Sequence, residues 1–222
     1  MLKTENLHIA FGSKKVLKGI SFELKPKTIT ALMGTNGSGK TTLFNIITGF
    51  LKADSGKLIY REQVLNGQSP VFRNKIGIAR TFQDLRLIKE LTVKENIVLA
   101  MKDNPGENIF NAMLPKSVLK QKNDEFGKKA GEIIGQVYLQ DVENSRAGEI
   151  SYGQQKLLTL ACCMANNPAL LLLDEPVAGI NPEYQKKIQE LLLNLKKEGK
   201  TVLLIEHNSE FIGNISDKLL FL

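Results

Sequence analysis

The sequence has few cysteines and no long apolar run. Its two cysteines, Cys162 and Cys163, are adjacent. Neighbours on a helix point about 100° apart, so we expect packing roles in a reducing compartment rather than a mutual disulfide. Apolar runs such as ALLLL at 169–173 are far shorter than the ~18 residues that a membrane-spanning helix needs. The N-terminal MLKTENLHIAFG also lacks the apolar core of a signal peptide, so a cytoplasmic chain is predicted.

The composition indicates a globular protein with a sizeable core. Of its 222 residues, 42% are hydrophobic and 24% are charged. The net charge of +7 permits an anionic ligand, a membrane surface or a nucleic acid as partner. Because the lysines are scattered and aromatic residues rarely lie between them, solvated helix faces explain most of this charge. We therefore expect no nucleic-acid partner.

The stretch MGTNGSGKTTLFNIITG, residues 33–49, carries the most informative motif. It follows TITALM (28–33), a predicted buried strand, and runs directly into a predicted helix. Residues 34–41 fit the phosphate-binding pattern G-x-x-x-x-G-K-[ST] in the strand–loop–helix context that confirms it. Its glycines let backbone N–H groups surround phosphate oxygens, Lys40 reaches the outer phosphates, and Thr41 offers a hydroxyl to Mg²⁺. The predicted ATP contacts of this segment are Gly34, Asn36, Gly37, Ser38, Gly39, Lys40, Thr41 and Thr42.

Two carboxylates end a second buried strand. The segment ALLLLDEP (169–176) is apolar until Asp174 and Glu175, which is typical of a central parallel strand covered on both faces. The carboxyl edge of such a sheet is where α/β proteins bind ligands. Asp174 suits the shell of a bound Mg²⁺, and Glu175 suits a general base that polarises an attacking water. An acidic pair that only caps a helix would not require the preceding strand.

Two further polar residues follow strand-like segments. TVLLIEH (201–207) ends in His207, which we expect at the same sheet edge, holding the γ-phosphate or the attacking water. IGIARTFQ (76–83) is also strand-like and ends in Gln83. An uncharged amide there could contact both magnesium and water, and it could tether the segment that follows.

Residues 84–166 differ from the rest because they are predicted to be helical. A capping box formed by Thr92 and Glu95 opens one helix, and KDNPGEN (102–108) marks a loop. Ser151, with Gln154 three residues later, opens another helix that extends to about Ala165. Between them, five apolar residues recur at helical spacing and predict one buried face: Phe126, Ala130, Ile133, Ile134 and Val137.

Together these motifs resemble those of the ABC-type ATPases, the nucleotide-binding subunits of ATP-binding-cassette transporters. The resemblance covers essentially the whole chain and rests on seven motifs in the family order. They are the aromatic Phe11, the phosphate loop 34–41, the Q-loop Gln83, the signature ISYGQ (150–154), the Walker B segment LLLLDE (170–175), the D-loop AGIN (178–181) and the switch His207.

The resemblance implies an α/β P-loop NTPase fold, with a mixed sheet core, an antiparallel β edge and an inserted α-helical subdomain. Residues 1–83 and 167–222 would form the nucleotide-binding core, and 84–166 the helical subdomain. The implied activity is hydrolysis of ATP with Mg²⁺, metal contacts coming from Thr41, Gln83 and Asp174. Phe11 would stack on adenine and Val16 would also contact the nucleotide.

The resemblance also implies partners. Two ATPase subunits, identical or different, would sandwich ATP head to tail and drive transmembrane permease subunits from the inner face of the membrane. The signature residues contributed in trans would be Ser151, Tyr152, Gly153 and Gln154.

Two departures from the common motifs narrow the resemblance. Tyr152 replaces a glycine of the signature, and Asn181 replaces the aspartate of the D-loop. With IARTFQDLRLIKELTVKENI (78–97), they resemble the ATPases of branched-chain amino-acid importers. Asn181 also has a local explanation as the N-cap of a helix over 182–197 that starts with proline. The last segment, SDKLLFL, ends inside a predicted strand, which indicates a short or truncated C-terminus relative to the family.

Three alternative functions are a soluble ABC ATPase, an exporter ATPase and a non-catalytic scaffold. Soluble ABC ATPases that act on DNA or the ribosome carry a long coiled coil or two cassettes, and neither is found here. An exporter ATPase for lipids or a lipopolysaccharide precursor stays possible, because partner chains form the substrate path. The presence of Lys40, Glu175 and His207 argues against a non-catalytic scaffold. The sequence leaves open the substrate, the membrane partners and the choice between homodimer and heterodimer.

Overall fold

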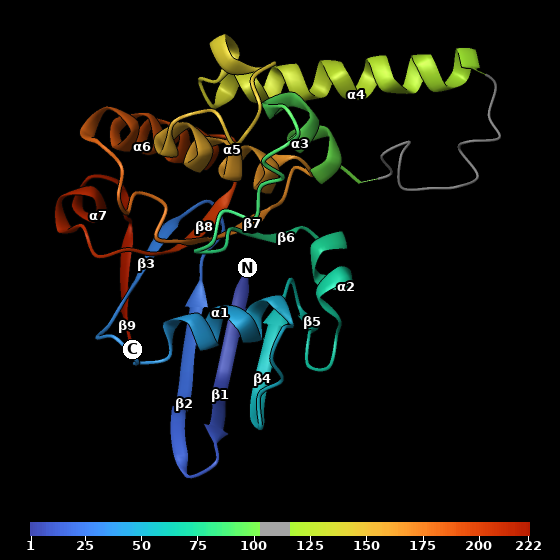
Figure 1. Cartoon of the computed structure of the whole chain (residues 1–222). Coiled ribbons are helices and arrows are strands. Elements are labelled where there is room, and N and C mark those ends of the chain that lie inside the picture. The colour runs from blue at the N-terminus through green and yellow to red at the C-terminus, as the bar shows by residue number, and fades with distance from the viewer. Residues whose placement is uncertain (103–115) are drawn as a thin grey trace. The chain divides into compact units, whose positions relative to one another are not determined.

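The computed structural model describes residues 1–102 and 116–222, which form two compact units (Figure 1). The sheet unit comprises 1–81, 168–178 and 192–222, and the helical unit comprises the described residues of 82–167 and 179–191. The sequence-based division at 83/84 and 166/167 remains a prediction of where the functional parts meet. Apart from Lys102, the predicted loop at 102–108 lies outside the described residues.

A five-stranded parallel sheet forms one layer of the sheet unit, with strand order β6-β7-β8-β3-β9. All four neighbouring pairs are parallel. Every residue of β7 and β8 is buried, because their continuous apolar sequences suit strands covered on both faces. The bounds are β3 Ile29–Met33, β6 Ile78–Arg80, β7 Leu170–Asp174, β8 Thr201–Ile205 and β9 Lys218–Phe221.

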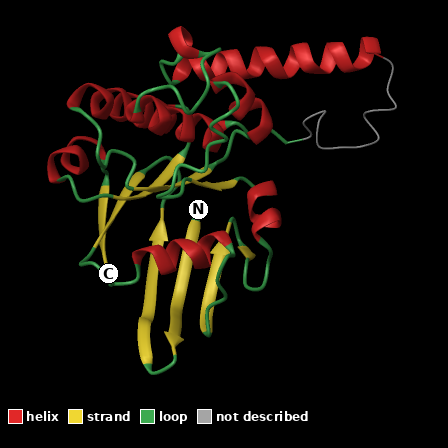
Figure 2. Cartoon of the chain, in the orientation of Figure 1, coloured by secondary structure: helices red, strands yellow, loops and turns green. Residues whose placement is uncertain are grey.

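The antiparallel strands form a sheet of their own, in the order β2-β1-β4-β5 (Figure 2). β1 pairs with β2 and β4 across antiparallel ladders, and its residues alternate largely between buried and exposed positions. The bounds are β1 Leu2–Phe11, β2 Lys14–Leu24, β4 Ser55–Tyr60 and β5 Gln63–Val64. The predicted α/β class with antiparallel strands is therefore confirmed.

Helix α1 (Lys40–Thr48) shares one core with both sheets. It ends at Gly49, whose φ of 85° is the left-handed conformation that glycine adopts readily. A second device caps this end of the helix. Arg73 of α2 (Pro70–Lys75) is buried and donates to the carbonyl oxygens of Ile46, of Ile47 at 2.9 Å and of Leu65 at 2.7 Å. Burial lowers the pKa of the Arg73 guanidinium.

The helical unit contains α3 (Val93–Ala100), α4 (Lys116–Gln136), η2 (Gln140–Val142) and α5 (Tyr152–Met164). α6 (Pro182–Lys197) runs from this unit into the sheet unit, which also contains α7 (Ser209–Ile215). Both predicted capping boxes are present, at the starts of α3 and α5. Ala130, Ile134 and Val137 of the predicted apolar face are fully buried. Within 1–102 and 116–222, no helix has the length and apolar character needed to cross a membrane.

Candidate functional site

The register of the parallel strands brings three of the predicted motifs to one edge of the sheet. Ile205 at the end of β8 lies opposite Leu32 of β3 on one side and Asp174 of β7 on the other. The glycine loop starts two residues after Leu32, and His207 lies two residues after Ile205. β8 ends at Ile205, two residues before His207. His207 nevertheless follows the carboxyl end of β8 beside Asp174, at the sheet edge where it was expected.

The glycine loop presents an uncapped helix N-terminus. Gly39, at the N-cap of α1, has a φ of 103°, and no side chain of the described residues caps the helix by a hydrogen bond. A β-carbon at Gly39 would lie 2.8 Å from Leu17 Cδ2 and 3.0 Å from Val16 Cγ1, so only glycine fits. Val16 therefore lies against the glycine loop. Its contact with the nucleotide remains a prediction. An uncapped start of this kind offers its N–H groups to an anion.

Lys40 and Ser38 are the polar side chains that the loop holds inside. The Lys40 ammonium is buried and donates to the carbonyl oxygens of Gly34 at 2.7 Å and Thr35 at 3.0 Å. The Ser38 hydroxyl oxygen is buried without a hydrogen-bond partner among the described residues. A buried hydroxyl of this kind calls for a ligand or water partner, which fits a loop built to bind phosphate.

The remaining predicted contacts of the loop lie on its open side. Asn36, Gly37 and Thr41 are exposed, and Thr42 is half-buried. Phe11, the predicted adenine contact, ends β1 at the turn into β2 and is 51% exposed. An aromatic ring exposed to this degree is available for stacking.

Asp174 lies at the centre of a buried polar network. Arg80 Nη2 donates to Asp174 Oδ2 at 3.0 Å, and Arg80 Nη1 donates to Asn45 Oδ1 of α1 at 2.6 Å. The backbone N–H of Asp174 donates to the hydroxyl oxygen of Thr81 at 3.1 Å. Arg80 thus joins the strand that carries Asp174 to the helix that follows the phosphate loop. This charge-assisted hydrogen bond holds the Asp174 carboxylate in one orientation.

Glu175 follows Asp174 in a strained conformation. Its φ of 50° lies in the left-handed region, which costs a non-glycine residue of order 1–3 kcal/mol and is concentrated at functional sites. Its backbone N–H donates to the carbonyl oxygen of Ile205 at 2.9 Å. The Glu175 carboxylate oxygen Oε1 lies 3.7 Å from His207 Nε2. Both side chains are partly exposed, so a water molecule can reach them.

A buried carboxylate, Glu206, connects the two loops that carry this pair. Its Oε1 accepts the backbone N–H of Val177 at 2.9 Å, and its Oε2 accepts those of His207 at 2.9 Å and Asn208 at 3.3 Å. Sequence reasoning missed it, although it directly follows the buried strand β8 just as Glu175 follows β7.

The structure corrects the expected position of Gln83. β6 ends at Arg80 rather than at Gln83, and Gln83 is an exposed residue of the helical unit. The Thr81 N–H still makes a ladder bond to the carbonyl oxygen of Leu172 at 2.9 Å. The strand ends there because the next N–H of the neighbouring strand, that of Asp174, donates to the Thr81 hydroxyl oxygen rather than to a main-chain carbonyl. The predicted magnesium contact of Gln83 remains a prediction.

The signature residues start α5 in the helical unit. Ser151 Oγ accepts the N–H of Gln154 at 3.3 Å, and the N–H of Ser151 donates to Gln154 Oε1 at 2.9 Å. A β-carbon on Gly153 would collide with the ring of Tyr184, and the Ser151 hydroxyl lies 3.4 Å from the Tyr184 hydroxyl. Tyr152, the departure from the common signature, is 47% exposed.

The Asn181 side chain caps α6. Its Oδ1 accepts the N–H of Tyr184 at 3.1 Å, and its carbonyl oxygen accepts that of Gln185 at 3.1 Å. This is the N-cap predicted from NPEY. The same helix presents Tyr184 to the signature residues Ser151 and Gly153, so the start of α6 contacts the signature within the helical unit.

The site residues suit Mg²⁺ bound together with a nucleotide. Within residues 1–102 and 116–222, no group of three or more His, Cys, Asp or Glu side chains could hold a metal ion alone. Mg²⁺ in nucleotide sites keeps water and phosphate oxygens and takes only one or two protein ligands. Thr41, exposed beside Lys40, and Asp174, with one carboxylate oxygen fixed by Arg80, supply oxygens of the required kind.

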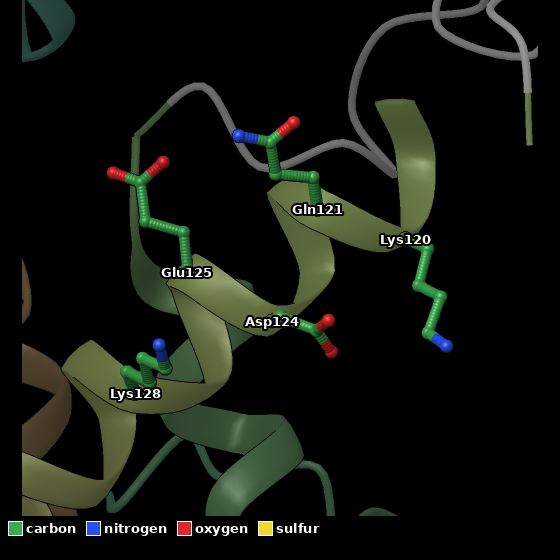
Figure 3. A pocket seen from close by; sticks show the side chains of 5 residues that line it. All are labelled: Lys120, Gln121, Asp124, Glu125 and Lys128. Atoms are coloured by element: carbon green, nitrogen blue, oxygen red, sulfur yellow. The ribbon is translucent and has the colours of Figure 1, made fainter. Parts of the chain in front are cut away.

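A hollow along α4 takes no part in this chemistry. It is lined by exposed residues of that helix (Figure 3), namely Lys120, Gln121, Asp124, Glu125 and Lys128.

The two cysteines also take no part in this chemistry. The thiols of Cys162 and Cys163 form no disulfide, and burial raises the pKa of each to about 12. They stay protonated and unreactive, in agreement with the predicted packing role.

The chain is similar to ATP-binding proteins of ABC transporters along most of its length. The model of the ABC transporter family matches residues 17–178. The probable branched-chain amino acid transport ATP-binding protein LivG of Methanocaldococcus jannaschii is 38% identical over 219 residues, which are 99% of this chain and 84% of that protein.

Solved structures of ATP-binding cassettes are similar to this chain along its whole length. A nucleotide-free ATP-binding cassette from an ABC transporter matches with a TM-score of 0.86 at 37% identity, covering 100% of this chain and 87% of that chain. A dimeric cassette in a post-hydrolysis state, bound to ADP and Pi, matches with a TM-score of 0.81 at 28% identity, covering 100% and 94%.

Proposed function

The chain belongs to the ABC transporter family as an ATP-hydrolysing subunit, and we propose that it powers import of branched-chain amino acids or similar small polar solutes. The observation that carries the substrate class is the similarity to a LivG protein along 99% of the chain. The Tyr152 and Asn181 variants, read from the sequence, support the same subgroup.

Nucleotide binding would use the glycine loop and its flanks. Phe11 would stack on the base, Val16 would line the sugar side, and the α1 N-terminus would receive the phosphates. Lys40 would exchange the carbonyl oxygens of Gly34 and Thr35 for phosphate oxygens. Its ammonium thus keeps hydrogen-bond partners with and without nucleotide, so binding does not leave a buried charge unpaired.

Hydrolysis would depend on Glu175 and His207. A water near the Glu175 carboxylate would give a proton to that carboxylate as its oxygen attacks the γ-phosphorus, and the bond from that phosphorus to the bridging oxygen would break, releasing ADP and phosphate. His207, 3.7 Å from Glu175, would hold the γ-phosphate or orient the water. Mg²⁺, when bound through Thr41 and Asp174, would neutralise phosphate charge; Gln83 is proposed as a further ligand.

We infer that two ATPase subunits close head to tail. The signature of one subunit, Ser151 to Gln154, would then face the phosphates held by the other. The dimeric cassette bound to ADP and Pi supports the pairing of two subunits by similarity. The exposed start of α5 and the Ser151 hydroxyl are suited to a γ-phosphate in trans. Closing and opening would move permease subunits contacted through the helical unit and the Gln83 segment, with the ATPase on the inner face of the membrane.

Reconstitution tests the proposal. The affinity-tagged chain is purified from membranes with its co-purifying permease subunits, and the whole complex is placed in liposomes. We expect ATP-dependent uptake of radiolabelled leucine that is lost in Glu175→Gln and retained in Glu198→Gln, which removes the same charge from an exposed site at the end of α6. ATP-driven movement of a labelled lipid without leucine uptake would instead support the exporter alternative.

A further inference from the structure

We propose that Glu206 is a positioning residue that holds Glu175 and His207 in their reactive arrangement. The inference rests on the proposed roles of Glu175 as general base and of His207 as its neighbour at the γ-phosphate. Glu206 is 4% exposed, and its partners in the described chain are three backbone N–H groups. Placing a carboxylate in such an environment is costly unless its oxygens are satisfied, and here both are.

The two oxygens of Glu206 bind two different loops. Oε1 holds Val177, two residues after Glu175, in the loop that follows β7. Oε2 holds His207 and Asn208 in the loop that follows β8. One rigid carboxylate therefore connects the backbones of both loops. We therefore expect a change in its size or acceptor geometry to alter the 3.7 Å separation between Glu175 Oε1 and His207 Nε2.

The arrangement requires a carboxylate rather than an amide. All three donors are N–H groups, and an ionised carboxylate accepts at both oxygens. A glutamine would turn its NH₂ group toward either the Val177 loop or the His207 loop, so one of the two connections would be lost. An aspartate keeps both acceptors but is one methylene shorter, so it would reach the two loops less well.

Glu206 should affect turnover more than nucleotide affinity. Its three hydrogen-bond partners lie in the loops after β7 and β8, whereas the phosphate loop follows β3. A misplacement of about 1 Å at a reacting group can lower rates about 10²-fold. An effect confined to kcat indicates an interaction needed for the chemical step.

Steady-state kinetics of the full-length ATPase provide the first test. We expect Glu206→Gln to lower kcat at least tenfold while KM for Mg-ATP stays within about threefold. Glu206→Asp should lie between Glu206→Gln and the unmodified protein. Glu198→Gln, the matched change at an exposed position, should keep kcat within about twofold.

A spectroscopic readout separates positioning from general destabilisation. The chain has two histidines, His8 and His207, so the ring proton NMR spectrum is simple to assign. In Glu206→Gln the ring signals of His207 should move while those of His8, on β1, stay in place. If Glu206→Gln does not fold, Glu206→Asp supplies both the kinetic and the NMR readouts.

A double-mutant cycle completes the test. If Glu206 acts through His207, adding Glu206→Gln to His207→Ala should lower kcat by much less than it does in the unmodified protein. Unchanged kcat and unchanged His207 signals in Glu206→Gln would overturn the proposal, as would full additivity in the cycle. Wild-type rates in both Glu175→Gln and His207→Ala would overturn the proposed roles of that pair and the positioning role with them. Slow turnover in those two variants with normal turnover in Glu206→Gln would overturn the positioning role alone.

Discussion

Replacing Glu175 with glutamine tests the proposed chemistry most directly. The amide keeps the size of the side chain and the left-handed backbone that Glu175 adopts at a φ of 50°. Its backbone bond to Ile205 is unaffected, so the turn after β7 should persist. What is lost is the ability to accept a proton from water, together with one negative charge beside the triphosphate.

The expected magnitude follows from the role of a general base. Such a group contributes about 10²–10⁴-fold in rate, which is about 2.7–5.4 kcal/mol at 1.36 kcal/mol for each factor of ten. His207 lies only 3.7 Å from Glu175 and could accept the proton in its place. We therefore expect a loss of hydrolysis rate at the lower end of this range. Removing negative charge should leave ATP affinity equal or higher.

Two assays measure these effects. Phosphate release under single-turnover conditions reports hydrolysis, and calorimetry reports binding of Mg-ATP. If hydrolysis reopens the nucleotide sandwich, Glu175→Gln should also accumulate as an ATP-bound dimer on size-exclusion chromatography. Glu198→Gln, exposed at the end of α6, should hydrolyse ATP at the wild-type rate and remain a monomer after turnover.

A wild-type rate of hydrolysis in Glu175→Gln would refute this reasoning. The general base would then lie elsewhere, and His207 would be the first residue to examine. A loss of binding together with hydrolysis would also contradict it, because the amide should not weaken nucleotide contacts.

Four further outcomes are expected. Lys40→Ala should weaken Mg-ATP binding at least tenfold, since it removes a charge-assisted contact of about 1.5–3 kcal/mol; unchanged affinity by calorimetry would mean that the loop does not bind phosphate. Ser151→Arg should abolish ATP-dependent dimerisation while preserving ATP binding, and mixing it with Lys40→Ala protein should restore one competent site per dimer; a mixture without ATP-driven association would count against the sandwich. Arg73→Met should lower the free energy of unfolding in urea by roughly 2–4 kcal/mol, because it removes a buried charged donor that bonds the carbonyl oxygens of Ile47, at the end of α1, and of Leu65; a change below about 0.5 kcal/mol would show that this cap is dispensable. Partial burial favours the neutral carboxyl of Asp217, but the hydrogen bond and charge of Lys196 and a backbone N–H outweigh it and lower the pKa. The resulting stability is present above the unfolded-state pKa of about 3.9 and is lost as pH falls through the lower folded-state value, so Asp217→Asn should be less stable than the unmodified protein at pH 7 and equally stable at the acid end of a urea series.

Much of the fold could be predicted from the sequence because its signals are local. The capping boxes at Thr92 and Ser151 involve side chains and N–H groups three residues apart, and both are present. The buried strands β7 and β8 were predicted from continuous apolar runs, which have no helical periodicity to compete with them. The phosphate loop was predicted because strand, glycines and helix occur in direct succession.

Boundaries and supporting contacts could not be predicted in the same way. β6 ends at Arg80 because the Thr81 side chain, rather than its main chain, accepts the N–H of Asp174 in a strand about 90 residues later. The pairing of Arg80 with Asp174 spans 94 positions, and that of Glu206 with Val177 spans 29. A charged residue within an apolar segment shows that some partner must exist, but nothing local identifies it.

Short-range sequence patterns were enough to predict the chemical groups of this protein: a phosphate loop, an acidic pair at the end of a buried strand, and a signature that starts a helix. Each depends on residue types at short spacing, where backbone geometry leaves little choice. How these groups are held depends on long-range pairing, because strand register aligns Leu32, Ile205 and Asp174 at one edge of the sheet. The connection that the buried Glu206 makes between the loops on either side depends on it too, since long-range pairing follows from how apolar surfaces pack together rather than from any local pattern.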